Sequence, residues 1–92
     1  MLDYSLIPGH MRGAMQRYIE DGIEPGGFLK AVLCNDFLGA FGKADDVNLR
    51  HMHDWAKFVY NELPNACHGS VEKYKAWVEV GGFRGLETED AA

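Results

Sequence analysis

Glycine and proline residues divide this chain into four stretches of helical periodicity, and this division restricts the fold more than any other feature. Pro8 suits the first turn of a helix, because its missing N–H would have no partner there. The later breaks are Gly22, Pro25-Gly26-Gly27, the pair Gly39 and Gly42, Pro64 and Gly81-Gly82. No segment alternates polar and apolar residues as a strand does. We therefore predict an all-α fold, a compact bundle of about four short, crossed helices.

The four helices are expected to start near Pro8, Pro25, Asp45 or Asp46, and Ser70, because an Asp or Ser side chain can accept hydrogen bonds from the first N–H groups of a helix. The second is expected to run to about Leu38 or Ala40. The buried stripe of the third is predicted to consist of Leu49, Met52, Ala56, Val59, Tyr60 and Leu63. We expect one helical domain over residues 1–85 and an acidic, flexible tail over residues 86–92.

Asp36 is predicted to lie among the apolar residues of the second helix. At about 100° per residue, it falls near the middle of the arc that Phe28, Leu29, Val32 and Leu33 define. A bare carboxylate there would cost several kcal/mol, so it must be paired, protonated or hydrated. Asn48 on the third helix is the expected partner in a buried polar pair that supports the fold. The alternative is a polar floor in a ligand cleft.

Charge and cysteine content exclude several classes of protein. The net charge of −5 argues against direct nucleic-acid binding, which depends on clustered Lys and Arg residues, and it permits an acidic surface that docks on a basic partner. Two cysteines are too few for a disulfide scaffold. Cys34 is expected in the core, Cys67 in a more accessible loop, and a bridge between them stays open. No apolar run approaches the roughly 18 residues of a membrane span, so we expect a soluble, cytosolic protein.

Residue patterns that carry enzyme chemistry are missing from the chain. There is no Gly-x-Ser-x-Gly elbow, and the four histidines do not follow zinc-ligand spacing. We therefore expect no enzymatic activity, no metal and no cofactor. One weaker candidate is the glycine turn, whose exposed N–H groups could hold a phosphate or nucleotide. Its predicted residues are Arg17, Tyr18, Gly26, Gly27 and Lys30.

Three large aromatic residues lie at the borders of the predicted apolar stripes. Trp55, Phe58 and Trp77 are expected either to complete the core or to form an interface, since aromatic residues dominate protein interfaces. In the second case they could support a homo-oligomer.

Three stretches of the chain resemble a group of short bacteriophage and prophage proteins of no established activity. They are Tyr-Ile-Glu-Asp-Gly-Ile-Glu-Pro-Gly-Gly-Phe-Leu-Lys-Ala-Val-Leu-Cys-Asn-Asp-Phe (18–37), Ala-Phe-Gly-Lys-Ala-Asp-Asp-Val-Asn (40–48) and Tyr-Asn-Glu-Leu-Pro-Asn-Ala-Cys-His-Gly-Ser (60–70), followed by Trp77. The resemblance covers most of residues 6–80.

This resemblance implies a small viral accessory protein that acts in the cytoplasm of a bacterial host. Such proteins often inhibit host systems by stoichiometric binding. The first expectation is therefore a non-enzymatic inhibitor of a bacterial protein or complex, in particular of a defence system, in the manner of an anti-CRISPR protein. The alternatives are a binder that sequesters an immune signalling nucleotide and a structural or regulatory phage protein acting as a homo-oligomer.

Overall fold

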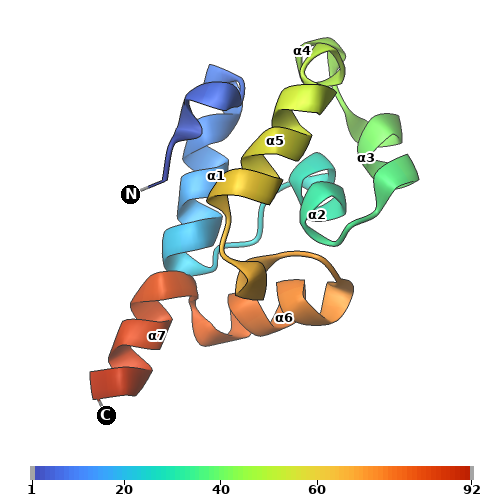
Figure 1. The fold of residues 1–92 in the computed structure, drawn as a ribbon. Helices are drawn as coiled ribbons and strands as arrows, with labels where there is room; N and C mark the ends of the chain where they lie inside the picture. The colour runs from blue at the N-terminus through green and yellow to red at the C-terminus, as the bar shows by residue number, and fades with distance from the viewer. Residues whose placement is uncertain (1, 92) are drawn as a thin grey trace.

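The computed structural model describes residues 2–91 and the side chains of residues 2–88, and it is helical throughout (Figure 1). No strand occurs within residues 2–91, which confirms the all-α class. The predicted number of about four helices is too low. The described residues form two 3-10 helices, η1 (Tyr4–Leu6) and η2 (Asn65–Cys67), and seven α-helices: α1 (Gly9–Asp21), α2 (Gly27–Leu33), α3 (Phe37–Lys43), α4 (Asp46–Arg50), α5 (Met52–Glu62), α6 (Val71–Val80) and α7 (Gly82–Ala91).

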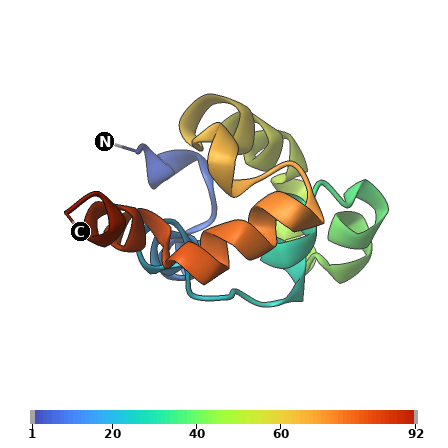
Figure 2. The same cartoon turned by 90° about the horizontal axis from the view of Figure 1, so that it is seen from below.

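Helices α1 and α6 begin and end where the sequence predicts. Gly22 ends α1 and Gly81 ends α6, both in the left-handed conformation, which glycine adopts without a steric penalty. The Ser70 side chain accepts a hydrogen bond from the N–H of Lys73 and so caps α6. Helix α6 crosses beneath α2 and α5, as Figures 1 and 2 show.

The predicted second helix is interrupted at Asn35, and this interruption overturns the expected position of Asp36. Asn35 adopts a left-handed φ of 61°. The N–H of Asp36 donates to the carbonyl of Ala31 at 2.8 Å and the N–H of Asn35 to that of Val32 at 3.2 Å, the pattern of a Schellman motif. Asp36 then accepts from the N–H of Gly39 at 3.0 Å as the N-cap of α3. Its carboxylate is exposed and lies outside the core.

The predicted third helix is also divided, at His51, into α4 and α5. Asp45 caps α4 as expected, with its carboxylate accepting from the N–H of Asn48. Beyond the break, Trp55 and Phe58 face the core, whereas Ala56 and Tyr60 are exposed. The predicted buried stripe of this segment is therefore wrong in its orientation. Leu63 is buried as expected, Met52 and Val59 are half-buried, and Leu49 is exposed.

A further helix, α7, occupies residues for which the sequence predicted no regular structure. Arg84 holds it to α1 through an ion pair with Asp21, at 2.7 Å between Nη1 and Oδ1. Gly22 and Gly82 meet where the two helices come together, so closely that a Cβ atom on Gly82 would lie 2.7 Å from backbone atoms of α1. The predicted flexibility of residues 86–92 stays a prediction, and residue 92 lies outside the described residues.

Aromatic side chains from α1, α2, α5 and α6 fill the core. The rings of Tyr18 and Tyr74 stack at 5.5 Å between centroids, and Phe28 packs edge-on against Trp55 at 5.3 Å. Each buried polar group at the centre has a partner. The Tyr18 hydroxyl donates to the carbonyl of Cys67 at 2.7 Å, and the Trp77 indole donates to the carbonyl of Tyr18 at 3.0 Å.

Candidate functional site

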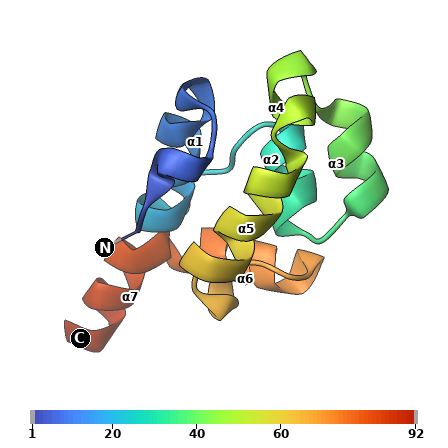
Figure 3. The ribbon, with the colours of Figure 1, turned by 45° about the horizontal axis from the view of Figure 1, so that its top comes forward.

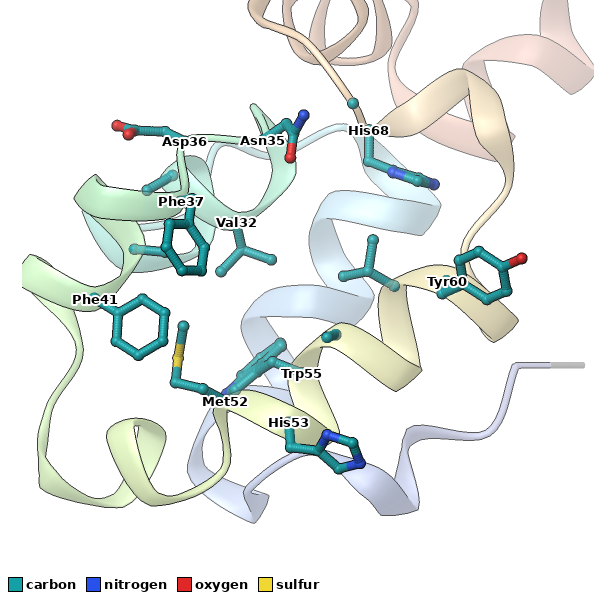
Figure 4. Close-up of a pocket in the computed structure, with 15 residues that line it drawn as sticks. Val32, Asn35, Asp36, Phe37, Phe41, Met52, His53, Trp55, Tyr60 and His68 are labelled. Carbon is teal, nitrogen blue, oxygen red and sulfur yellow. The ribbon is translucent and has the colours of Figure 1, made fainter.

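An open apolar groove of about 580 Å³ lies between the α2–α3 pair and α5 (Figure 4). One wall comes from α2 and α3, chiefly Val32, Phe37 and Phe41, and the other from one side of α5. Trp55 also lines the groove, with only 1% of its surface exposed. On α5 the lining residues are Met52, His53, Trp55, Ala56, Val59 and Tyr60. The remaining lining residues are Ala31, Asn35, Asp36, Ala40, His68 and Gly69.

The Schellman motif at Asn35 is what opens the groove. Because the chain reverses there, α3 packs beside α2 instead of extending it (Figures 1 and 3). Phe37 and Phe41 therefore lie on the wall of the groove that faces α5 (Figure 4). The two rings stack edge-on at 5.0 Å between centroids. Helix α3 lies at the edge of the molecule in all three ribbon views, so this wall has no helix on its outer side.

One end of the groove is held by the loop before α6. Gly69 donates its N–H to the carbonyl of Leu33 at 2.8 Å and has a φ of 112°, a conformation that favours glycine. This bond ties the loop to the end of α2 and places His68 at the groove. Burial, with a smaller contribution from the Lys73 ammonium, holds the pKa of His68 below its usual 6.5, so the imidazole is neutral at pH 7.

The groove leaves large apolar side chains in contact with water. Among its lining residues Phe37 is 69% exposed and Tyr60 88% exposed, and Leu38, which belongs to α3 but does not line the groove, is 79% exposed. Large apolar side chains that stay exposed around a groove are typical of binding sites. In Figure 4, Val32 and Phe37 point into the groove, whereas Asp36 points outward at its rim.

The groove offers little chemistry for catalysis or for phosphate binding. None of its fifteen lining residues is Lys or Arg, and Asp36 is the only carboxylate. Within the part of the chain that the structure describes, no three His, Cys, Asp or Glu side chains come close enough together to hold a metal ion. What the groove presents is apolar area with a sparse polar rim, which is suited to binding.

The predicted Asp36–Asn48 pair is wrong, because the two residues have other partners. Asn48 is buried, as predicted, but its side-chain oxygen accepts from the indole N–H of Trp55 at 3.2 Å. The sequence interpretation missed this bond because it placed Trp55 at the edge of the helix.

The residues of the predicted phosphate site are not gathered into one place. Gly26 and Gly27 line a separate hollow of about 220 Å³ beside Lys43. Tyr18 is fully buried, and its hydroxyl already donates a hydrogen bond to the carbonyl of Cys67. The Lys30 ammonium lies 5.7 Å from the ring centre of Tyr74. Arg17, exposed on α1, lines neither this hollow nor the groove. Ligand binding at the glycine turn stays a prediction, without Tyr18.

Of the two alternatives for the three large aromatic residues, completion of the core is confirmed and the exposed interface is wrong. Phe58 is fully buried, Trp55 is 1% exposed and Trp77 is 3% exposed.

The relative burial of the two cysteines is the opposite of the prediction. Cys67 is fully buried and Cys34 half-buried, and both are free thiols.

Sequence reasoning did not identify the groove. The signal for it was Asn35-Asp36, a residue that tolerates the left-handed conformation followed by a good N-cap.

None of the helices within residues 2–91 has the length and apolar character of a membrane span. Comparison with protein-family models, with curated proteins and with solved structures found no match.

Proposed function

We propose that this protein is a phage accessory protein that binds a bacterial host protein and blocks it, with the groove between α2–α3 and α5 as its binding surface. The observation that carries the proposal is the groove itself, an open apolar surface of about 580 Å³ with a sparse polar rim. The phage context comes from the resemblance of residues 6–80. Within that context, the blocked protein belongs to a bacterial defence system and the site of action is the host cytoplasm.

The shape of the groove favours a protein partner over a small molecule. A drug-sized ligand is usually buried over 70–90% of its surface, whereas Phe37 and Tyr60 leave this groove wide open to solvent. The absence of Lys and Arg from its lining also makes a nucleotide a poor ligand for it. The proposed mechanism is therefore stoichiometric blockade, without catalysis.

Substitution of Ala56 tests the proposal directly. Ala56 is exposed in the middle of the α5 wall, so Ala56→Arg would fill the groove without touching the core. Ala76, exposed on α6 and outside the groove, provides the matched control Ala76→Arg.

The experiment is affinity purification of each variant from defence-proficient bacteria, followed by identification of the partner and measurement of the mass of the complex. The wild-type protein and Ala76→Arg are expected to purify in a complex of fixed stoichiometry that Ala56→Arg does not form. A complex that Ala56→Arg retains in full would refute the groove as the binding surface.

A further inference from the structure

We infer that the occupant of the groove is a short amphipathic α-helix of the partner, apolar on the side that enters and basic at the end that lies near Asp36. This inference rests on the proposed function, because it specifies the partner of the same groove. It follows from three properties of the groove: its lack of backbone partners, its shape and its charge.

The first argument concerns the backbone of the occupant. The walls of the groove are helices, whose N–H and C=O groups are paired within each helix outside its terminal turns, and no strand edge exists within residues 2–91. An extended segment in this apolar groove would leave its N–H and C=O groups without partners, which costs free energy for each buried group. A helix satisfies these groups internally and so enters without that penalty.

A polyproline segment would avoid part of the same penalty, but the one Trp ring among the lining residues cannot donate a hydrogen bond to it. Grooves of that kind are lined by aromatic residues, which also donate hydrogen bonds to the carbonyls of the ligand. Here the indole N–H of Trp55 is already donated to Asn48 inside the core. The ring therefore contributes apolar area only.

The shape of the α5 wall is suited to helix packing. Met52, Ala56 and Tyr60 are spaced four residues apart and form a single ridge along α5. Ala56 is the smallest of the three and lies at the centre, where it allows a second helix to approach closely. From Met52 to Tyr60 the ridge is about 12 Å long, so an occupant of about three turns would cover it.

The charge around the groove sets the polarity of the occupant. Asp36 is the only carboxylate among the lining residues, and no lining residue is Lys or Arg. One of its oxygens accepts from Gly39, and the carboxylate points outward at the rim, within reach of a long basic side chain (Figure 4). The net charge of −5 adds attraction for a basic segment and opposes a second copy of the same chain.

The test uses three synthetic peptides of about fourteen residues with one leucine stripe at helical spacing. The first has Lys at both ends and the second has Glu at both ends. The third is the Lys peptide with a central proline, which breaks the helix. Fluorescence anisotropy measures their binding to the wild-type protein, to Asp36→Asn, to Ala56→Arg and to the control Ala76→Arg.

The Lys peptide is expected to bind the wild-type protein and Ala76→Arg alike, to lose binding to Ala56→Arg, and to bind at least about tenfold more tightly than its proline version. Asp36→Asn keeps an N-cap acceptor but removes the charge. It is expected to weaken the Lys peptide by about two- to fivefold, as for an exposed ion pair, and not the Glu peptide.

Equal binding of the proline peptide would overturn the helical occupant, and equal binding of the Lys and Glu peptides would overturn the basic end. Undiminished binding of the Lys peptide to Ala56→Arg would place it outside the groove. A dimer of the free protein that Ala56→Arg dissociates would identify a second copy as the occupant and overturn the inference. If no peptide binds while Ala56→Arg still loses the partner, the helix inference fails and the proposed function stands.

Discussion

At the scale of single residues, the hydrogen bond between Asn48 and Trp55 links α4 to α5 inside the core. Trp55 contacts Phe28 and Phe58 and also lines the groove, so its ring connects the core to the groove. The Asn48 side-chain oxygen is the acceptor for its indole N–H. A buried donor without a partner lowers the free energy of unfolding by about 1–3 kcal/mol. Loss of the Asn48 acceptor is therefore expected to destabilise the fold by about that amount.

Replacement of Asn48 by Leu is therefore expected to lower the free energy of unfolding by about 1–3 kcal/mol, because the indole N–H loses its acceptor. Urea denaturation followed by circular dichroism measures this change. Asn61→Leu, at an exposed position of α5, serves as the control and should stay within about 0.5 kcal/mol of the wild type. Equal stability of the two variants would show that the bond contributes nothing.

The two thiols should react very differently with a thiol reagent. Burial raises the pKa of Cys67 to about 12, so at pH 8 this thiol is both protonated and shielded. We expect one reactive thiol per native molecule, Cys34, and two after denaturation. Rapid reaction of both thiols in the native protein would contradict this burial.

The burial of Cys67 also makes the stability of the fold depend on pH. Because the pKa of Cys67 is raised in the folded state, its contribution to stability is present below pH 9 and is lost as the pH rises toward 12.

At the scale of elements, the break between α2 and α3 determines whether the protein has the groove. Asn35 ends one helix in the left-handed conformation and Asp36 starts the next. The sequence interpretation placed both residues inside a single helix, since Phe28, Leu29, Val32, Leu33 and Phe37 fit one continuous period. Apolar periodicity does not distinguish one long helix from two short ones packed side by side, because both bury an apolar face.

Removal of the α3 cap tests this description of the break. Asp36→Ala is expected to lower the free energy of unfolding by about 0.5–2 kcal/mol, because the N–H of Gly39 loses its acceptor, whereas Asp36→Asn should change it little. Thermal denaturation of the two variants measures the difference. A loss of several kcal/mol in both would instead indicate a buried, paired carboxylate.

At the scale of the whole molecule, the fold has a rigid junction on one side and an open groove on the other. The junction is the contact of Gly22 and Gly82 where α7 meets α1, and the groove lies between α2–α3 and α5. In Figure 1, α1 and α7 lie on one side of the molecule and α3 on the other. The helical class, the bounds of α1 and α6 and the capping roles of Asp45 and Ser70 could be predicted from local patterns. The orientation of α5 and the groove were missed, because apolar periodicity placed Trp55 at the edge of its helix, away from its partner Asn48, and carried no trace of the chain reversal that the Asn35-Asp36 pair makes.

The junction is expected to tolerate no side chain. Gly82→Ala combines a left-handed φ of 66° with a Cβ atom 2.7 Å from the backbone of α1, so it should destabilise the fold by about 2–5 kcal/mol. Gly42→Ala, in open space within α3, is the control and should be neutral or stabilising by up to about 1 kcal/mol. Equal denaturation midpoints for the two variants would contradict the close contact of α1 and α7.

The claim that the groove is the functional surface is tested most directly by phage survival. The measurement is the plating efficiency of a sensitive phage on strains that each carry one defence system and express wild-type protein, Ala56→Arg or Ala76→Arg. We expect the wild-type protein and Ala76→Arg to raise plating on at least one strain, and Ala56→Arg, with unchanged thermal stability, to leave it at the level of the empty vector. Full activity of Ala56→Arg, or no effect of the wild-type protein on any strain, would contradict this account.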